Sequence, residues 1–327
     1  MNVTDWSKFV DKSGKFERPQ TTFHEWISSK PGSRFPPEKG RYHLYVSYAC
    51  PWAHRVLIAR KLYRLEDTIS YTVVHWHIQD GGWRFANLDD EGVDEGHRLP
   101  HPDHQSFTHL RQVYYESDPS YQARFSVPAL YDSVNKVIVN NESSEILRMF
   151  GTEFNNVIDD PHPEISLYPE ALQGEIDEAN EWQYTDLNNG VYKCGVASTQ
   201  KMYDLAVTEL FHALDRVEAH FKTVDGPFWF GKNVSEVDIR LFVTIIRFDP
   251  VYVQHFKCNI CDIRSGYPYI HKWLRNLYWN VPAFRETTDF LHIKYHYTRS
   301  HVPVNPSGIT AMGPLPHILP LDEEVSV

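Results

Sequence analysis

Cys50 is followed by a proline and by an apolar stripe of helical spacing, which predicts a thiol at the first turn of a helix. A helix N-terminus carries about half a positive charge and unpaired N–H groups, and both stabilise a thiolate. Cysteines in this position have pKa values lowered from about 8.5 to roughly 3.5–7.5. Ala53 stands where a dithiol oxidoreductase has its second cysteine, so we expect one protein thiol to act with an external thiol. The alternative, a buried structural cysteine, is disfavoured by the strand–Cys–Pro–helix context.

Two further pairs of residues suit the binding of a peptide. Pro128 begins a predicted strand, a place that normally excludes proline. In a thioredoxin-like domain this proline is cis, and the residue before it, here Val127, offers its N–H and C=O to an extended peptide. Glu142 and Ser143 begin a predicted helix, where free N–H groups and a hydroxyl can hold a carboxylate while Glu142 holds an ammonium. With Cys50 these residues predict a glutathione cradle, although an edge-strand proline and a plain helix N-cap are the simpler alternatives.

The elements that must position these residues follow from periodicity. Residues 41–48 alternate in hydrophobicity and residues 69–74 are β-branched, so both predict strands. Between them we expect an amphipathic helix with His54 on its polar face. Further predicted elements are a hairpin at residues 127–131 and 137–139 and a helix at residues 143–150. Residues 76–123, rich in Gly, Asp, His and Pro, predict an insertion that is either functional or partly disordered.

A second region contains only helical patterns. Apolar residues from Tyr203 to Phe221 recur at spacings of 4 and 3, and residues 235–238 form a capping box before a buried helix. Another stripe begins at Ile270. The chain therefore divides into an extension (1–40), an α/β thioredoxin-like domain (41–158), an all-helical domain (164–299) and an irregular tail (300–327).

The charge balance, the length of the apolar runs and the number of cysteines argue against several classes of protein. The 327 residues contain 32 Lys and Arg against 43 Asp and Glu, a net charge of −11 that disfavours nucleic acid as a partner. No apolar run reaches 18 residues, which predicts no membrane span. Four cysteines are too few for a disulfide framework, and no signal peptide is recognised, so we expect a cytoplasmic protein.

We expect no metal. Cys258 and Cys261 form a lone CxxC pair, whereas zinc needs four ligands, although His255 lies close in the sequence. The histidines of the insertion are interpreted as part of a solvated loop rather than as metal ligands. They are His97, His101, His104 and His109.

Longer motifs resemble those of the S-glutathionyl-hydroquinone reductases, the xi class of glutathione transferases. They are residues 47–55 (SYACPWAHR), 127–128 (VP), 141–146 (NESSEI), 188–193 (NNGVYK), 305–309 (NPSGI) and 313–314 (GP). The likeness covers about residues 41–314. It implies a thioredoxin-like domain followed by the all-helical C-terminal domain of glutathione transferases, and glutathione as co-substrate.

The resemblance also implies roles for single residues. Cys50 is the nucleophile, and Trp83, Val127 with Pro128, Glu142 and Ser143 bind glutathione. Arg124 meets a glutathione carboxylate, with Arg111 as the alternative.

In the same family, Tyr184 and Tyr297 flank the hydroquinone and stabilise its oxygens, with Tyr295 and Tyr192 as rivals. The implied reaction removes glutathione from glutathionylated hydroquinones through a mixed disulfide on Cys50, in a homodimer. The alternatives are an omega-like thiol transferase or dehydroascorbate reductase, a conjugating transferase, and a non-catalytic glutathione-binding module.

Overall fold

A computed structural model of the chain describes residues 10–11, 14, 16–79, 81–87, 89–90, 99–158 and 165–323. The chain divides into two units. The first is made of Gln20–Ile165 and Thr287–His296, and the second of Ser166–Glu286 and Tyr297–Val327 with the earlier segment Asp5–Pro19. The domain boundaries expected from the sequence stay a prediction, and the junction at residues 159–164 lies outside the described residues.

The first unit is built on a four-stranded mixed sheet with the order β2-β1-β3-β4. Its strands are β1 (Tyr42–Val46), β2 (Ser70–Val73), β3 (Ala129–Asp132) and β4 (Val137–Asn140). β1 runs parallel to β2 and antiparallel to β3, which pairs antiparallel with β4. Every residue of β1 and β3 is buried, because the two central strands are covered on both faces.

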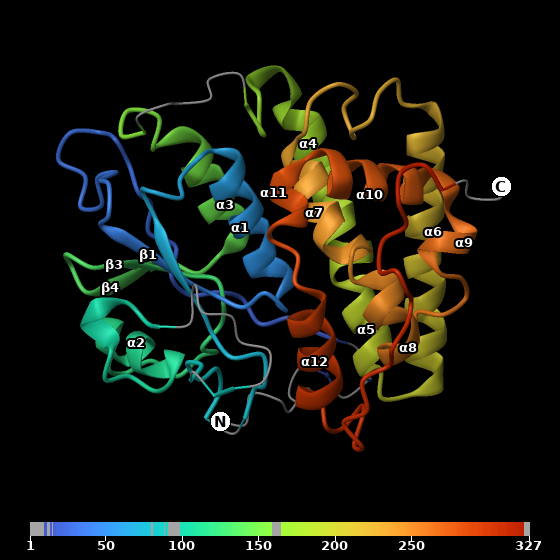
Figure 1. Cartoon of the computed structure of the whole chain (residues 1–327), viewed down its shortest axis with the longest axis horizontal. Helices are drawn as coiled ribbons and strands as arrows, with labels where there is room; N and C mark the ends of the chain where they lie inside the picture. Colours follow the sequence, from blue (N-terminus) through green and yellow to red (C-terminus); the bar gives the residue numbers. More distant parts are fainter. Residues whose placement is uncertain are drawn as a thin grey trace. The chain divides into compact units, whose positions relative to one another are not determined.

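Helices α1 (Pro51–Leu62) and α3 (Ser143–Thr152) lie on one face of the sheet and α2 (Leu110–Ser117) on the other, as Figure 1 shows. The strand–helix–strand start, the hairpin and α3 agree with the predicted elements, and the unit has the thioredoxin-like arrangement. α2 falls inside the segment that we predicted to be an insertion. Helix α1 is buried almost all round, so the prediction of an outward His54 is wrong: its Nε2 lies 3.0 Å from Thr287 Oγ1 in the core.

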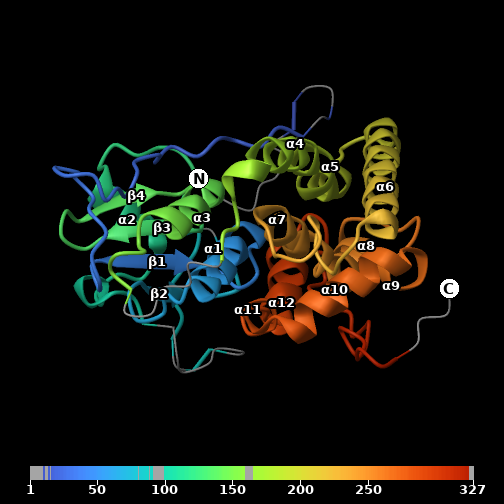
Figure 2. The same ribbon diagram turned by 90° about the horizontal axis from the view of Figure 1, so that it is seen from above.

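The second unit is helical, as expected. Its main helices are α4 (Gln173–Gln183), α5 (Gly190–Val196), α6 (Gln200–Thr223), α7 (Glu236–Ile245), α9 (Ile263–Gly266), α10 (Pro268–Asn280) and α11 (Pro282–Arg285). Short turns precede or join them at Glu170–Leu172 (η3), Tyr184–Asn188 (η4), Phe248–Tyr252 (η5) and Val253–His255 (α8). α5 packs against the long α6 (Figure 2).

Two local predictions in this unit are confirmed. The stripe from Tyr203 to Phe221 lies on α6, and its residues are buried at the predicted spacing from Val207 onward, whereas Tyr203 is half-buried. Ser235 and Asp238 form the capping box at the start of α7. The last helix, α12 (Phe290–Ser300), is divided between the units after His296, and the described tail beyond residue 300 is irregular, as predicted.

Candidate active site

Cys50 is the N-cap of α1, and Pro51 is the first residue of that helix. The backbone carbonyl of Cys50 accepts the first helical hydrogen bond from His54 N, at 3.0 Å. The half-buried Cys50 thiol donates to the carbonyl oxygen of Val127 at 3.4 Å, and the Val127–Pro128 peptide bond is cis, as predicted. Cys50 and Val127, 77 residues apart, therefore meet at the positive end of a helix.

Two tyrosines hold the segment that leads to the cis proline. Tyr114 donates its hydroxyl hydrogen to the Ser126 carbonyl at 2.7 Å and accepts from Asn141 Nδ2 at 3.2 Å. Tyr121 donates to the Arg124 carbonyl at 2.8 Å. Burial raises the pKa of the Tyr114 hydroxyl, which therefore stays a donor at neutral pH. Sequence reasoning did not identify Tyr114, Tyr121 or Asn141 as part of the site, although Asn141 is the first residue of the motif at residues 141–146.

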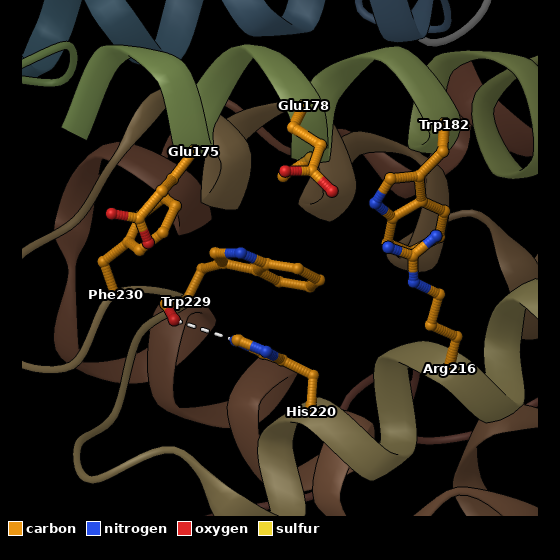
Figure 3. Close-up of a pocket in the computed structure, with 8 residues that line it drawn as sticks. Glu175, Glu178, Trp182, Arg216, His220, Trp229 and Phe230 are labelled. Atoms are coloured by element: carbon orange, nitrogen blue, oxygen red, sulfur yellow. Dashed lines mark hydrogen bonds between the residues drawn. The ribbon is translucent and has the colours of Figure 1, made fainter.

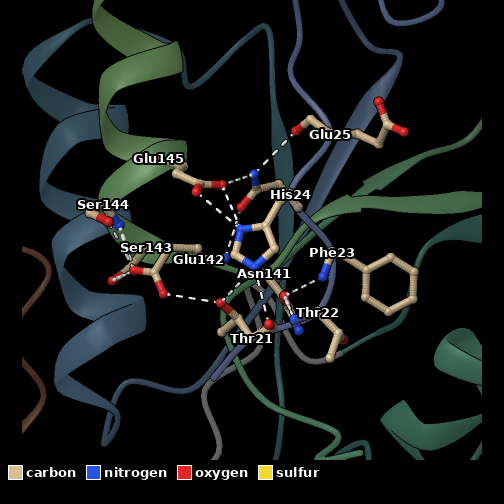
Figure 4. A network of polar contacts seen from close by, with 11 residues as sticks. Thr21, Thr22, Phe23, His24, Glu25, Asn141, Glu142, Ser143, Ser144 and Glu145 are labelled. Carbon is tan, nitrogen blue, oxygen red and sulfur yellow. Dashed lines mark hydrogen bonds and ion pairs between the residues drawn. The ribbon is translucent and has the colours of Figure 1, made fainter. Parts of the chain in front are cut away.

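The start of α3 is formed by Glu142 and Ser143. Glu142 is the N-cap, and its carboxylate accepts from the backbone N and the hydroxyl of Ser144 at 3.1 and 3.0 Å (Figure 4). Ser143 is buried at the first position of the helix. The structure thus places a half-buried carboxylate beside the N–H groups of a helix terminus, a pair that can meet an ammonium and a carboxylate.

The N-terminal extension is part of this region. Thr21 donates its hydroxyl hydrogen to Glu142 at 3.2 Å, and the backbone N–H of Phe23 donates to Asn141 Oδ1 at 3.1 Å (Figure 4). His24 Nδ1 lies 3.0 Å from the Glu145 carboxylate. Burial lowers the pKa of His24, but the hydrogen bonds with Glu145 and the Thr21 carbonyl outweigh it, so the net pKa is raised. Residues 21–24 therefore fasten the extension to the first turn of α3.

Trp83 and Tyr295 lie in the first unit. The Trp83 ring is buried and stacks on His296 with centroids 5.0 Å apart. The Tyr295 ring meets Trp76 edge to face at 5.2 Å. Arg124 is half-buried next to the Val127 segment, whereas Arg111 is exposed on α2.

Tyr297 belongs to the second unit and is the centre of a hydroxyl cluster. Its oxygen lies 2.7 Å from that of Tyr192 and 3.1 Å from that of Tyr252, and all three side chains are buried. Burial, followed by the neighbouring tyrosines, raises the pKa of Tyr297 well above its ordinary value, and burial does the same for Tyr252. These hydroxyls keep their protons at neutral pH. Sequence reasoning named Tyr192 only as a rival and missed Tyr252.

Tyr184 stands apart from this cluster in its exposure, which is 38%. It begins the π-helical turn η4, and Tyr252 ends a second π-helical turn, η5. Such turns interrupt the regular hydrogen bonding of a helix and recur at functional sites. Two residues apart on α12, Tyr295 and Tyr297 point to different sides of the helix.

The other cysteines and histidines that the sequence analysis considered are described by their burial and their contacts. Cys194 and Cys258 are buried, and burial and the adjacent Cys194 raise the pKa of Cys258. His104 is also buried, with hydrogen bonds to Tyr45 and Glu116, so the prediction of a solvated loop is wrong there. His97 lies outside the described residues. Among the residues that the structure describes, no group of three or more His, Cys, Asp or Glu is placed to hold a metal ion.

A cavity of about 210 Å³ opens in the second unit between α4 and α6 (Figure 3). Trp229 lines this cavity and is stacked on His220 with ring centroids 3.9 Å apart, and the Arg216 guanidinium lies 4.1 Å from the Trp182 ring. Its lining includes none of the residues predicted for the site. In the part of the chain that the structure describes, no helix has the length and apolar character needed to cross a bilayer.

Comparisons with known proteins show the family to which the chain belongs. Residues 49–153 match the model of the glutathione S-transferase N-terminal domain, and residues 199–276 match that of the C-terminal domain. The chain is 51% identical to the glutathione S-transferase omega-like 2 of Schizosaccharomyces pombe, over 97% of this chain and 98% of that protein. It is 43% identical to a glutathionyl-hydroquinone reductase of Escherichia coli, over 94% and 92% of the two chains. The crystal structure of a xi glutathione transferase from Saccharomyces cerevisiae in complex with glutathione has a TM-score of 0.87 and 44% identity, covering 94% of this chain and all of that one (100%).

Proposed function

Since the chain belongs to the xi class of the glutathione transferase family, we propose that this glutathione-dependent enzyme removes glutathione from S-glutathionyl-hydroquinones. The observation that carries the proposal is the Cys50 thiol at the start of α1, within hydrogen-bond distance of the residue before the cis proline. A serine or tyrosine there would activate glutathione for conjugation. A cysteine instead forms a disulfide with it.

The reaction proceeds in two steps, a displacement at the thioether sulfur of the substrate and then a thiol–disulfide exchange. The Cys50 thiolate attacks the sulfur of the glutathionyl group, the bond from that sulfur to the ring carbon breaks, and the carbon takes a proton to give the free hydroquinone. The Cys50–glutathione mixed disulfide is then attacked by the thiolate of a second glutathione. Glutathione disulfide leaves and the Cys50 thiolate returns. Two glutathione sulfurs are oxidised and the ring is reduced, so the electrons balance.

The first unit supplies the groups that bind glutathione. The N–H and C=O of Val127, before Pro128, pair with the peptide backbone, and Glu142 accepts the ammonium. The N-terminus of α3 at Ser143 and the Arg124 guanidinium take the two carboxylates, and Trp83 covers the peptide. The structure of a 44% identical relative in complex with glutathione supports the binding of glutathione itself.

The tyrosines serve the hydroquinone. In this proposal Tyr184 and Tyr297 line the acceptor pocket, with Tyr295, on another side of α12, as the alternative to Tyr297. The hydroxyls of Tyr184 and Tyr297 donate to the ring oxygens or protonate the leaving carbon. The raised pKa of Tyr297 supports a donor rather than a phenolate. The partners are glutathione and glutathionylated quinones, and we expect a cytoplasmic homodimer that uses no metal.

The second candidate is an omega-like thiol transferase or dehydroascorbate reductase, because a 51% identical relative carries the omega-like name. Both reactions need Cys50 and the residues that bind glutathione. They differ in whether turnover depends on the tyrosines of the acceptor pocket. A non-catalytic glutathione-binding module is the third candidate, and it predicts that Cys50→Ala keeps full biological activity.

The test is mass spectrometry of the protein after incubation with glutathionyl-menadiol, the hydroquinone form of glutathionyl-menadione. We expect one glutathione adduct on Cys50, together with release of menadiol. Cys261→Ala is the matched control, since Cys261 is half-buried like Cys50, and it should form the adduct normally. An adduct on another cysteine, or menadiol release by Cys50→Ala, would refute the proposal.

A further inference from the structure

Three basic side chains lie together in the second unit, away from the residues assigned to glutathione. His271 and Arg275 are one turn apart on α10, so they share one side of the helix, and Arg264 comes from α9. Burial, followed by the charges of Arg275 and Arg264, lowers the pKa of His271 to about 4, against the opposing carboxylate of Asp262. Since α9 packs against α10, the charges of both guanidinium groups act on the same imidazole.

The cluster contains buried donors that no acceptor satisfies. Arg275 is 6% exposed and His271 3% exposed. Within the described residues, Arg275 Nε and Nη2, His271 Nδ1 and Arg264 Nε have no hydrogen-bond partner. A buried guanidinium is costly unless an anion or several acceptors replace its lost water, so this arrangement requires a counter-group.

The chain's own acceptors nearby are committed to other donors. Asp262 accepts from the backbone N and hydroxyl of Ser265 at 2.7 and 2.5 Å, and Asp249 accepts from the backbone N of Ile263 and Arg264. In the described part of the chain, neither Arg264 nor Arg275 forms an ion pair.

The tail lies against the same helices. Arg264 Nη2 donates to the carbonyl oxygens of Pro316 and His317 at 2.6 and 3.1 Å, and Trp279 Nε1 donates to that of Leu319 at 2.9 Å. These neutral carbonyls satisfy one nitrogen of Arg264 and leave the charge of Arg275 uncompensated.

We propose that Arg264, His271 and Arg275 bind a tetrahedral oxyanion, phosphate or sulfate, beside the tail residues 316–319. The planar guanidinium groups offer N–H pairs that match two oxygens of such an ion. Neutral His271 donates one more hydrogen from Nδ1 when its proton is placed there. The site requires no glutathione, so this inference stands independently of the proposed reaction.

The experiment is isothermal titration of the full chain with inorganic phosphate, and separately with sulfate, in a phosphate-free buffer. We expect saturable one-to-one binding, and a rise in Tm of about 2–4 °C over sodium chloride of equal ionic strength. Arg275→Met should weaken the binding at least about tenfold. Lys272→Met removes a positive charge from an exposed position of the same helix and should leave it unchanged.

Two further arms make the result decisive. If Arg275→Met does not fold, Arg264→Met carries the same expected loss. Glycerol 3-phosphate distinguishes the source of the group, because tighter binding than inorganic phosphate assigns the site to an organic phosphate and equal binding to the free ion. No saturable binding by the wild-type chain, or equal loss in the Lys272→Met control, would overturn the proposal.

Discussion

Replacing Tyr114 by phenylalanine removes one oxygen atom from beneath the loop that carries Val127. That oxygen donates to the Ser126 carbonyl at 2.7 Å and accepts from Asn141 Nδ2 at 3.2 Å. Both partners lose a hydrogen bond in a buried place, and an unsatisfied buried polar group costs about 1–3 kcal/mol. We expect the free energy of unfolding to fall by about that amount.

The same change should weaken glutathione binding, because Ser126 directly precedes Val127. If the change destabilises the glutathione-binding conformation of the Val127 loop by about 1.4 kcal/mol, the glutathione KM rises about tenfold. The turnover number should change little, since Tyr114 touches no reacting atom. Urea unfolding and steady-state kinetics measure the two effects, and Tyr115→Phe, at an exposed neighbour on α2, is the control. A stability loss with an unchanged KM would show that Tyr114 supports the fold without positioning the loop.

Four other changes test the rest of the site. Cys50→Ala should abolish reductive turnover. In the wild-type protein, Cys50 should react with iodoacetamide at pH values well below about 8.5. If the midpoint of the pH dependence of this alkylation lies at or above that value, the helix does not stabilise the thiolate. Arg124→Ala should raise the glutathione KM about tenfold, which kinetics at a saturating concentration of the glutathionyl-hydroquinone would measure. Tyr297→Phe should lower turnover on glutathionyl-hydroquinones about tenfold or more and spare a small mixed disulfide; equal loss on both substrates would assign it to packing. The raised pKa of His24 means that its pairing with Glu145 stabilises the fold below pH 6.5 and is lost as pH rises through the folded pKa, so His24→Gln should destabilise the protein more at about pH 5.5 than at about pH 8.5.

Much of the fold could be predicted because its signals are local. The Cys–Pro turn, the stripe of α6 and the capping box of α7 each lie within one element, where spacing and residue type determine the conformation. α2 escaped prediction because only Leu110, Val113 and Tyr114 of its eight residues are buried, too short a stripe to stand out from a polar segment.

The missing parts of the site depend on residues far apart in the sequence. Histidine is a polar residue that the helical pattern places on the exposed face, but His54 is buried because Thr287, 233 residues later in the sequence, contacts it. Tyr252 is one of 19 tyrosines, and nothing near it in the sequence indicates that its hydroxyl meets Tyr297. Residue type predicted which chemistry to expect, but only the folded chain shows these pairings.

The segment Thr287–His296 belongs to the unit that holds the sheet, and this has a consequence for the order of synthesis. The ribosome completes all four strands by residue 140, yet the side chains that contact His54 and Trp83 come from Thr287 and His296. The first unit therefore cannot reach its final packing until nearly the whole chain has been made, even though domains of a nascent chain generally fold from the N-terminus onward. A chimaera that joins this sheet to the helical half of a relative must keep residues 287–296 of this chain together with the sheet, because a single junction near residue 160 separates that segment from its partners.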